Sequence, residues 1–397
     1  MTPRQAPPRA PRRLAGAGRP VRLRPGQKVT VIFEAMDAEG MAVGRAGGQP
    51  VRVPFAVPGE EALVEIVRPG RAATGRIAAL LRKSPETTAP RCRHFGVCGG
   101  CQWQHLADDA QRRLKTALVR QYLGPLLGDA PVAEAVGAAP WAYRSRLQAT
   151  FGRRAERLVA GFYAADEMRR IINVRECPIQ MPANVAALEA ARAALAATGW
   201  SVYDPATRRG LLRGLIVQTA QATGELMVIL SASGELPDRM ACVRALRDAL
   251  PALVSVFLSV QPRHTPELLG RCVLLWGRPY VDEEIAGVRL RLGPRPDIPP
   301  APQAAVQWLE AIGAALAPGP LDVVVDTACG DGFVPLWLAR RARRVIGVAA
   351  DRAAMHRAWD QARLNGTSNC LFYTREPARV VAKLSARGER IDAALVA

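Results

Sequence analysis

Apolar and polar positions divide the chain into regions with different periodicities. Short alternating runs between glycine and proline turns fill residues 26–83, which predicts a small closed β-barrel of the oligonucleotide-binding type. A helical period follows at 105–122, and 140–290 mixes helices with paired strands, including a hairpin within 211–231. From residue 321 apolar strands alternate with helices, a pattern typical of a parallel α/β sheet.

The C-terminal pattern predicts a definite order of elements. A strand leads through a glycine-rich turn into a helix, and strands and helices then alternate. We expect strands at 323–325, 345–348, 371–373 and 391–396, a helix from the turn to 343, and helices at 351–365 and 377–387. These elements form half of a doubly wound sheet, in which the last strand would be an edge.

Together these regions predict an α/β multidomain protein. In chain order we expect a disordered basic tail (1–25), a β-barrel (26–87), a central α+β domain (88–295) and an incomplete Rossmann-like domain (296–397). An organellar transit peptide is the alternative for the tail, but its prolines disfavour an amphipathic helix. No apolar run reaches the roughly 18 residues of a membrane helix, so we expect a cytoplasmic protein without a membrane partner.

The charge of the chain narrows the class of partner. Its formal net charge is +19, which favours a polyanion. Only four of the 54 basic residues are lysines, Lys28, Lys83, Lys115 and Lys383. A GC-rich coding bias produces the same excess of arginine, so the charge supports a polyanionic partner without establishing it.

Four of the eight cysteines have the spacing of metal ligands. Cys92, Cys98 and Cys101 lie in a short glycine-rich loop, where the backbone can approach a metal closely, and Cys177 is a solitary fourth candidate. Four thiolates suit zinc or an iron–sulfur cluster. Zinc ribbons usually pair two short Cys-x-x-Cys units, so the solitary fourth cysteine favours a cluster. Unliganded cysteines are the remaining alternative.

The glycine-rich turn at 326–332 carries a second candidate site. An acid, Asp326, is followed at fixed spacing by Gly330 and Gly332, between a strand and a helix. The glycines let the backbone close over a nucleoside and its tail without a side-chain clash. A dinucleotide turn would require a third glycine where Pro335 stands. The pattern is that of class I methyltransferases, which favours S-adenosylmethionine as the cofactor.

Three segments, 92–105, 140–146 and 176–180, together resemble the S-adenosylmethionine-dependent RNA uracil-C5 methyltransferases. The barrel at 26–83 resembles the TRAM domain of that family, so the resemblance covers nearly the whole chain from residue 26. It implies a substrate, a uridine in ribosomal or transfer RNA. It also implies a [4Fe–4S] cluster held by four thiolates, those of Cys92, Cys98, Cys101 and Cys177.

The resemblance adds two cofactor residues and marks two departures. Glu376 stands where the family places an acid near the adenine, and Asp351 is a substitute for the family's ribose-binding Glu, since Ala349 occupies that position. The simpler role of Asp351 is a helix N-cap. Residues 297–301 replace a family segment whose Gln and Asn serve the cofactor and base. The predicted cofactor residues are Asp326, Gly330, Gly332, Asp351 and Glu376.

No catalytic residue is assigned. The family's Asp-Pro-Pro-Arg motif, its nucleophile loop Ser-Cys-Asn-Pro and its general-base Glu have no counterpart up to Ala397. The other cysteines, Cys242, Cys272, Cys329 and Cys370, have no base beside them in the sequence. We therefore expect a truncated or split methyltransferase that is inactive alone, with a second chain completing its sheet. The alternative is a non-catalytic iron–sulfur RNA-binding protein.

Overall fold

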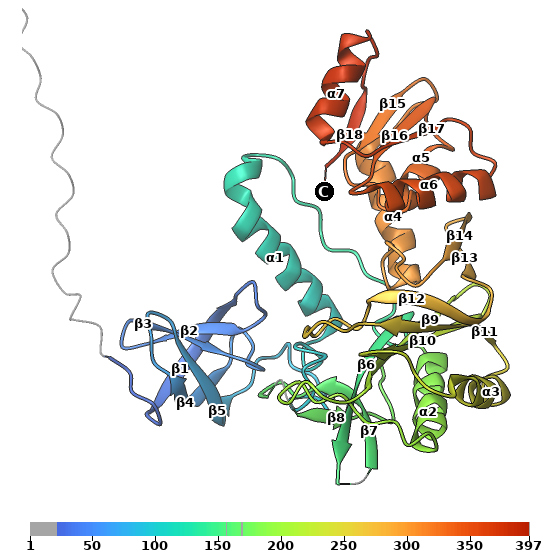
Figure 1. Cartoon of the computed structure of the whole chain (residues 1–397). Coiled ribbons are helices and arrows are strands. Elements are labelled where there is room, and N and C mark those ends of the chain that lie inside the picture. The colour runs from blue at the N-terminus through green and yellow to red at the C-terminus, as the bar shows by residue number, and fades with distance from the viewer. Residues whose placement is uncertain (1–21, 156, 168–169, 397) are drawn as a thin grey trace, which may run out of the picture. The chain divides into compact units, whose positions relative to one another are not determined.

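The computed structural model describes residues 22–155, 157–167 and 170–396 (Figure 1). These residues form two compact units. The first extends to Pro90 and includes Gln102–Ala133; the second consists of Arg91–Cys101 and the chain from Glu134 onward. Most of the predicted basic tail lies outside the described residues.

The first unit contains a closed five-stranded barrel with the order β1-β2-β3-β5-β4, which confirms the predicted barrel. Alternate side chains of β1, such as Val31 and Phe33, are fully buried inside it. Gly44 faces the neighbouring strand so closely that a Cβ there would overlap the carbonyl oxygen of Ile32. The strands are β1 (Lys28–Met36), β2 (Ala42–Ala46), β3 (Gln49–Val53), β4 (Glu61–Arg68) and β5 (Ala73–Arg82).

Helix α1 (Asp108–Leu127) belongs to the same unit as the barrel, although the sequence analysis assigned it to the central domain. Its Leu114 and Leu118 pack against the barrel core. The helix continues past the predicted end at residue 122, through Gly124 and Pro125. Pro125 lacks a backbone donor and its ring crowds the carbonyl one turn earlier, and the helix ends two residues later at Leu127.

A seven-stranded sheet forms the centre of the second unit, with the order β12-β11-β10-β9-β6-β7-β8. Neighbouring strands are antiparallel except β10 and β11. The predicted hairpin is confirmed as the β9–β10 pair. The strands are β6 (Arg146–Arg154), β7 (Arg157–Tyr163), β8 (Ile171–Asn173), β9 (Leu212–Thr219), β10 (Leu226–Ala232), β11 (Leu253–Val260) and β12 (Arg271–Gly277).

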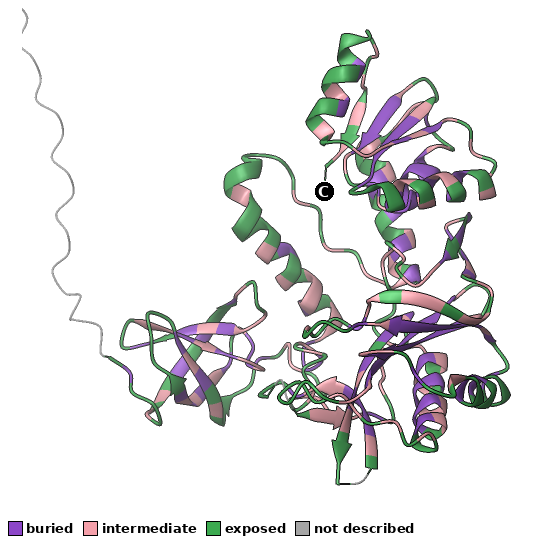
Figure 2. Ribbon diagram, in the orientation of Figure 1, coloured by how far each residue is buried: buried purple, intermediate pink, exposed green. Residues whose placement is uncertain are grey.

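Both faces of this sheet are covered, and every residue of β9 and β10 is buried (Figure 2). Helices α2 (Pro182–Ala196) and α3 (Arg239–Ala249) pack on the face that carries Leu215 and Val217. The opposite face carries Ile216, which joins a core shared with the C-terminal elements.

The C-terminal elements confirm the predicted alternation of strands and helices. After a hairpin and α4, the chain builds a parallel four-stranded sheet in the Rossmann-like order β17-β16-β15-β18. The strands are β13 (Val281–Ile285), β14 (Val288–Leu292), β15 (Val323–Asp326), β16 (Arg344–Val348), β17 (Cys370–Tyr373) and β18 (Ala393–Leu395). The helices are α4 (Pro302–Leu316), α5 (Phe333–Leu338), α6 (Arg352–Leu364) and α7 (Pro377–Ala386).

Helix α5 is shorter than the prediction that it would reach residue 343. The amide of Asn369 donates hydrogen bonds to the carbonyl groups of Ala339 (2.8 Å) and Ala342 (3.0 Å), so these carbonyls are satisfied outside a helix. The predicted edge strand is confirmed as β18, which pairs with β15. Among the helices in the described ranges, none is long and apolar enough to cross a membrane.

Candidate functional site

The glycine turn after β15 brings three of the five predicted cofactor residues together. Asp326 ends the strand with 1% of its surface exposed, and its Oδ1 accepts a hydrogen bond from the backbone N–H of Ala328 at 3.0 Å. Burial raises the pKa of Asp326 to about 6. Gly330 and Gly332 have φ angles of 51° and 87°, a conformation that favours glycine.

Residues 297–301, which lack the Gln and Asn of the corresponding family segment, contact this turn through Asp297. The carboxylate of Asp297 lies against Gly330, where an added Cβ would overlap it. The backbone N–H of Asp297 donates to Oδ2 of the buried Asp331 at 3.0 Å, and Nε of Arg357 on α6 donates to Oδ1 of Asp331 at 2.7 Å. Asp331 therefore ties the turn to two neighbouring segments.

Asp351 and Glu376 lie at the same edge of the sheet as Asp326. Asp326 ends β15, whereas Asp351 follows β16 and Glu376 follows β17. These three strands are parallel, so their carboxyl ends share one edge of the sheet. Asp351 is the N-cap of α6, where its Oδ1 accepts from the N–H of Ala354 at 2.8 Å. Glu376 is exposed and pairs with Arg379 at 3.2 Å. Both carboxylates already have local partners.

The four predicted metal ligands lie in one unit of the chain. Cys92, Cys98 and Cys101 lie in the loop 91–101, and Cys177 lies between β8 and α2. An ion pair of 2.8 Å between Arg93 and Glu176 joins the two segments. The backbone N–H of Gly99 donates to the carbonyl of Tyr163 at 2.9 Å, which fixes the loop to the end of β7.

The thiols of the loop 91–101 and of Cys177 influence one another electrostatically. Burial, with smaller contributions from Cys101 and Cys92, raises the pKa of Cys177 to about 11. Burial also raises the pKa of Cys98, with smaller contributions from the same two cysteines. Within the described ranges, however, no group of three or more His, Cys, Asp or Glu side chains is arranged to hold a metal ion. Convergence of the four thiols on a metal thus stays a prediction.

The remaining cysteines are poor nucleophiles. Burial raises the pKa of Cys242 to about 11 and those of Cys329 and Cys370 to about 12, so each is a neutral thiol at pH 7. Cys272 is half-buried; its pKa is also raised by burial, although Arg295 and Arg146 lower it.

Sequence reasoning missed the residues that hold the glycine turn in place. Asp331 lies inside the motif, but within it only Asp326, Gly330 and Gly332 were assigned a role. Arg357 and Asp297 are separated from it by 26 and 34 positions, so no local spacing reveals the contact. The position of Asp331 between Gly330 and Gly332 was the one signal in the sequence that this acid has a role in the turn.

Comparisons with known proteins place the chain in a family. No family model matches it. An uncharacterized RNA methyltransferase of Halalkalibacterium halodurans is 31% identical over 375 residues, which are 93% of this chain and 81% of the relative. An uncharacterized RNA methyltransferase of Bacillus cereus is 30% identical over 375 residues.

A solved structure has the same fold. The Pyrococcus abyssi tRNA (uracil-54, C5)-methyltransferase, determined in complex with S-adenosyl-L-homocysteine, matches with a TM-score of 0.70 and 21% identity. The match covers 87% of this chain and 79% of that one. With relatives of this identity and coverage, the chain belongs to the RNA methyltransferases.

Proposed function

We propose that the protein acts in the methylation of uracil C5 in ribosomal or transfer RNA, and that its 397 residues bind S-adenosylmethionine and RNA. The observation that carries the proposal is the turn of Asp326, Gly330 and Gly332 at the carboxyl edge of a parallel sheet. Membership of the RNA methyltransferases and the fold shared with a tRNA uracil-C5 enzyme support the choice of reaction.

The residues of the turn fit the proposed cofactor. S-adenosylmethionine supplies the methyl group and carries positive charge on its sulfonium and ammonium groups. Two glycines with positive φ allow close backbone approach, and the buried Asp326 provides an acceptor for a cation. Asp351 and Glu376 would hold the ribose and the adenine from the same edge. Because Ala349 is apolar and Asp351 already caps α6, the ribose contact is the weakest part of this assignment.

We also propose that Cys92, Cys98, Cys101 and Cys177 hold a [4Fe–4S] cluster, which would join the loop 91–101 to the segment before α2. Their mutual effect on pKa supports proximity. The Nε2 atom of His94, between two of these cysteines, is buried without a hydrogen-bond partner among the described residues.

The cysteine spacing is the ground for preferring a cluster to a zinc ion. Three of the cysteines share one short loop and Cys177 is solitary and distant, whereas zinc ribbons usually pair two short Cys-x-x-Cys units.

RNA is the proposed partner, bound through the TRAM-like barrel, the central domain and the basic tail. The closed five-stranded barrel and the net charge of +19 support this assignment. Cytoplasmic localisation and a second chain that pairs with β18 stay predictions.

We propose that this polypeptide alone does not form the covalent bond to uracil C6 that makes C5 reactive. Such a bond needs a thiolate. Buried neutral thiols, as at Cys242, Cys329 and Cys370, do not supply one. The alternative function, a non-catalytic RNA-binding protein, is favoured by the same observation but leaves the cofactor turn unexplained.

One set of measurements tests the proposal. Calorimetry with S-adenosylhomocysteine should show binding, and a uridine-containing transfer RNA transcript should bind in a salt-dependent manner. RNA containing 5-fluorouracil should give no covalent adduct on a denaturing gel. Absence of cofactor binding would contradict the proposed function and favour the RNA-binding alternative. An adduct would contradict the proposed inactivity, and Cys272→Ser would then be the first variant to examine.

A further inference from the structure

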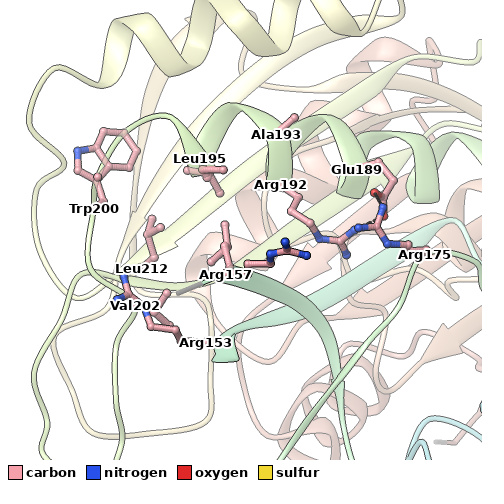
Figure 3. A pocket seen from close by; sticks show the side chains of 13 residues that line it. Arg153, Arg157, Arg175, Glu189, Arg192, Ala193, Leu195, Trp200, Val202 and Leu212 are labelled. Atoms are coloured by element: carbon pink, nitrogen blue, oxygen red, sulfur yellow. Dashed lines mark hydrogen bonds and ion pairs between the residues drawn. The ribbon is translucent and has the colours of Figure 1, made fainter. Parts of the chain in front are cut away.

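An arginine-lined cavity of about 470 Å³ lies away from the glycine turn, on the α2 side of the central sheet (Figure 3). Residues from β6, β7, α2 and the segment after α2 line it. Its charged lining residues are four arginines and one glutamate, Arg153, Arg157, Arg175, Arg192 and Glu189. Nothing in the proposed cofactor or cysteine sites uses these side chains.

Positive charge exceeds negative charge in this cavity. Glu189 is shared between Arg175, at 3.3 Å, and Arg192. Arg157 is exposed and has no ion pair within the described part of the chain. Among the described lining residues, one carboxylate therefore faces four guanidinium groups, an arrangement that attracts an anion.

Arg192 forms a fixed part of the wall. Its side chain is 10% exposed, and Nη2 donates to the carbonyls of Ala160 (3.1 Å) and Val174 (2.8 Å). Its Nε is buried and has no hydrogen-bond partner among the residues that the structure describes. Arg192 is therefore held by backbone carbonyls and adds positive charge to the wall, and the exposed side chains of Arg157 and Arg175 are the guanidinium groups open to an anion.

The end of the cavity away from Glu189 carries an aromatic ring. Figure 3 shows Trp200, Val202 and Leu212 there, with Arg153 beside them, and it shows Arg175 and Glu189 at the other end, with Arg157 between the two ends. Guanidinium groups in the same cavity as a flat aromatic ring match the two halves of a nucleotide. Phosphates bind guanidinium groups, and bases stack on tryptophan.

We propose that this cavity is a subsite for one nucleotide of the bound RNA, separate from the nucleotide that is methylated. Its phosphate pairs with Arg157 and Arg175, and its base stacks on Trp200. This inference rests on the proposed function, since it takes the partner to be RNA. A free mononucleotide shares the same chemistry and is distinguished below.

Binding of a fluorescent RNA oligonucleotide to the full chain, titrated with salt, tests the subsite. Arg157→Gln should lower the slope of log affinity against log salt by about 0.7, the value for one lost contact to a single strand. Trp200→Leu should weaken binding about tenfold, whereas Trp200→Phe should retain most of the affinity because Phe still stacks. Arg244→Gln is the matched control: Arg244 is exposed on α3 and has no ion pair among the described residues.

Ultraviolet cross-linking with peptide mapping identifies the contact directly. Bound RNA should cross-link to the peptide that contains Trp200, and excess uridine monophosphate should not compete. Competition at equal concentration would overturn the assignment to an RNA strand in favour of a mononucleotide. If Arg157→Gln and Trp200→Leu behave as Arg244→Gln does, the subsite is wrong while RNA binding stands. A wild-type chain that binds no RNA contradicts the proposed function itself, and the subsite with it.

Discussion

The glycine turn and the cysteine loop were both predicted from short motifs, but the fold completes them to different degrees. In the turn, Gly330 and Gly332 adopt positive φ angles next to the buried Asp326, and Asp331 ties the turn to neighbouring segments. The three cysteines of the loop share one unit with Cys177, but among the described residues they form no group arranged to hold a metal ion.

This difference follows from what builds each site. The turn is made by backbone conformation, which the packing of β15, α5 and α6 determines without a ligand. The loop depends on side chains whose thiols resist ionisation when buried, as the raised pKa of Cys177 shows. A bound metal removes that cost by coordinating thiolates. We therefore expect the loop to depend on its ligand far more than the turn does.

The largest effect should come from replacing one of the four predicted cluster ligands, Cys92, Cys98, Cys101 or Cys177. Protein purified without oxygen should be brown, with broad visible absorption that bleaches on reduction. Cys177→Ser and Cys98→Ser should lose this absorption and the bound iron, since three thiolates hold a cluster poorly. Iron and sulfide analysis, with visible spectra, measures the loss.

Cys272→Ser is the matched control, because Cys272 is also half-buried but lies outside the loop. It should remain brown. A colourless wild-type protein with one zinc per chain would show that the cluster assignment is wrong, although the four ligands could stand.

Next in size is the effect of a side chain in the glycine turn. Gly330→Val places a β-branched residue at a φ of 51° and against the Asp297 carboxylate, so cofactor binding should become undetectable by calorimetry. Gly234→Val is the control, since Gly234 has open space around its Cβ position and is not among the positive-φ glycines. Normal binding by Gly330→Val would place the cofactor elsewhere.

The fold was largely predictable because its periodicities are strong. The hairpin pattern within 211–231 marked β9 and β10, and strand–turn–helix alternation marked the parallel sheet. The end of α5 was not predictable, since it depends on Asn369, which follows it by about 30 positions. The same limit hid the contacts of Asp331 with Asp297 and Arg357.

A smaller effect should appear in the pH dependence of stability. Burial raises the pKa of Asp326 from near 3.8 to about 6. The unfolded chain then ionises first, so Asp326 lowers stability as pH rises from about 4 to 6, with no further change above that. The upper limit is about 3 kcal/mol, from roughly two units at about 1.4 kcal/mol each.

The Asp326→Asn variant isolates this contribution. It should be more stable than wild type above pH 6 and should lose the advantage below pH 4, as measured by urea unfolding across that range. Bound S-adenosylmethionine should reduce the difference, because its positive charge favours the carboxylate. Parallel stability curves for the two proteins would show that the Asp326 pKa is not raised.

The smallest effect concerns the ion pair that fixes the turn to α6. Asp331 is 5% exposed at its side chain and accepts from Arg357 and from the backbone of Asp297, so Asp331→Ala leaves two donors without an acceptor. Because Arg357 is 39% exposed and water can solvate it, the expected cost is about 2 kcal/mol, below that of a fully buried pair.

Asp360→Ala is the control on the same helix: Asp360 and its partner Arg363 are 67% and 73% exposed, and the expected change is about 0.5 kcal/mol or less. Urea unfolding of both variants measures the contrast, and equal losses would mean that the turn is held by its glycine backbone alone.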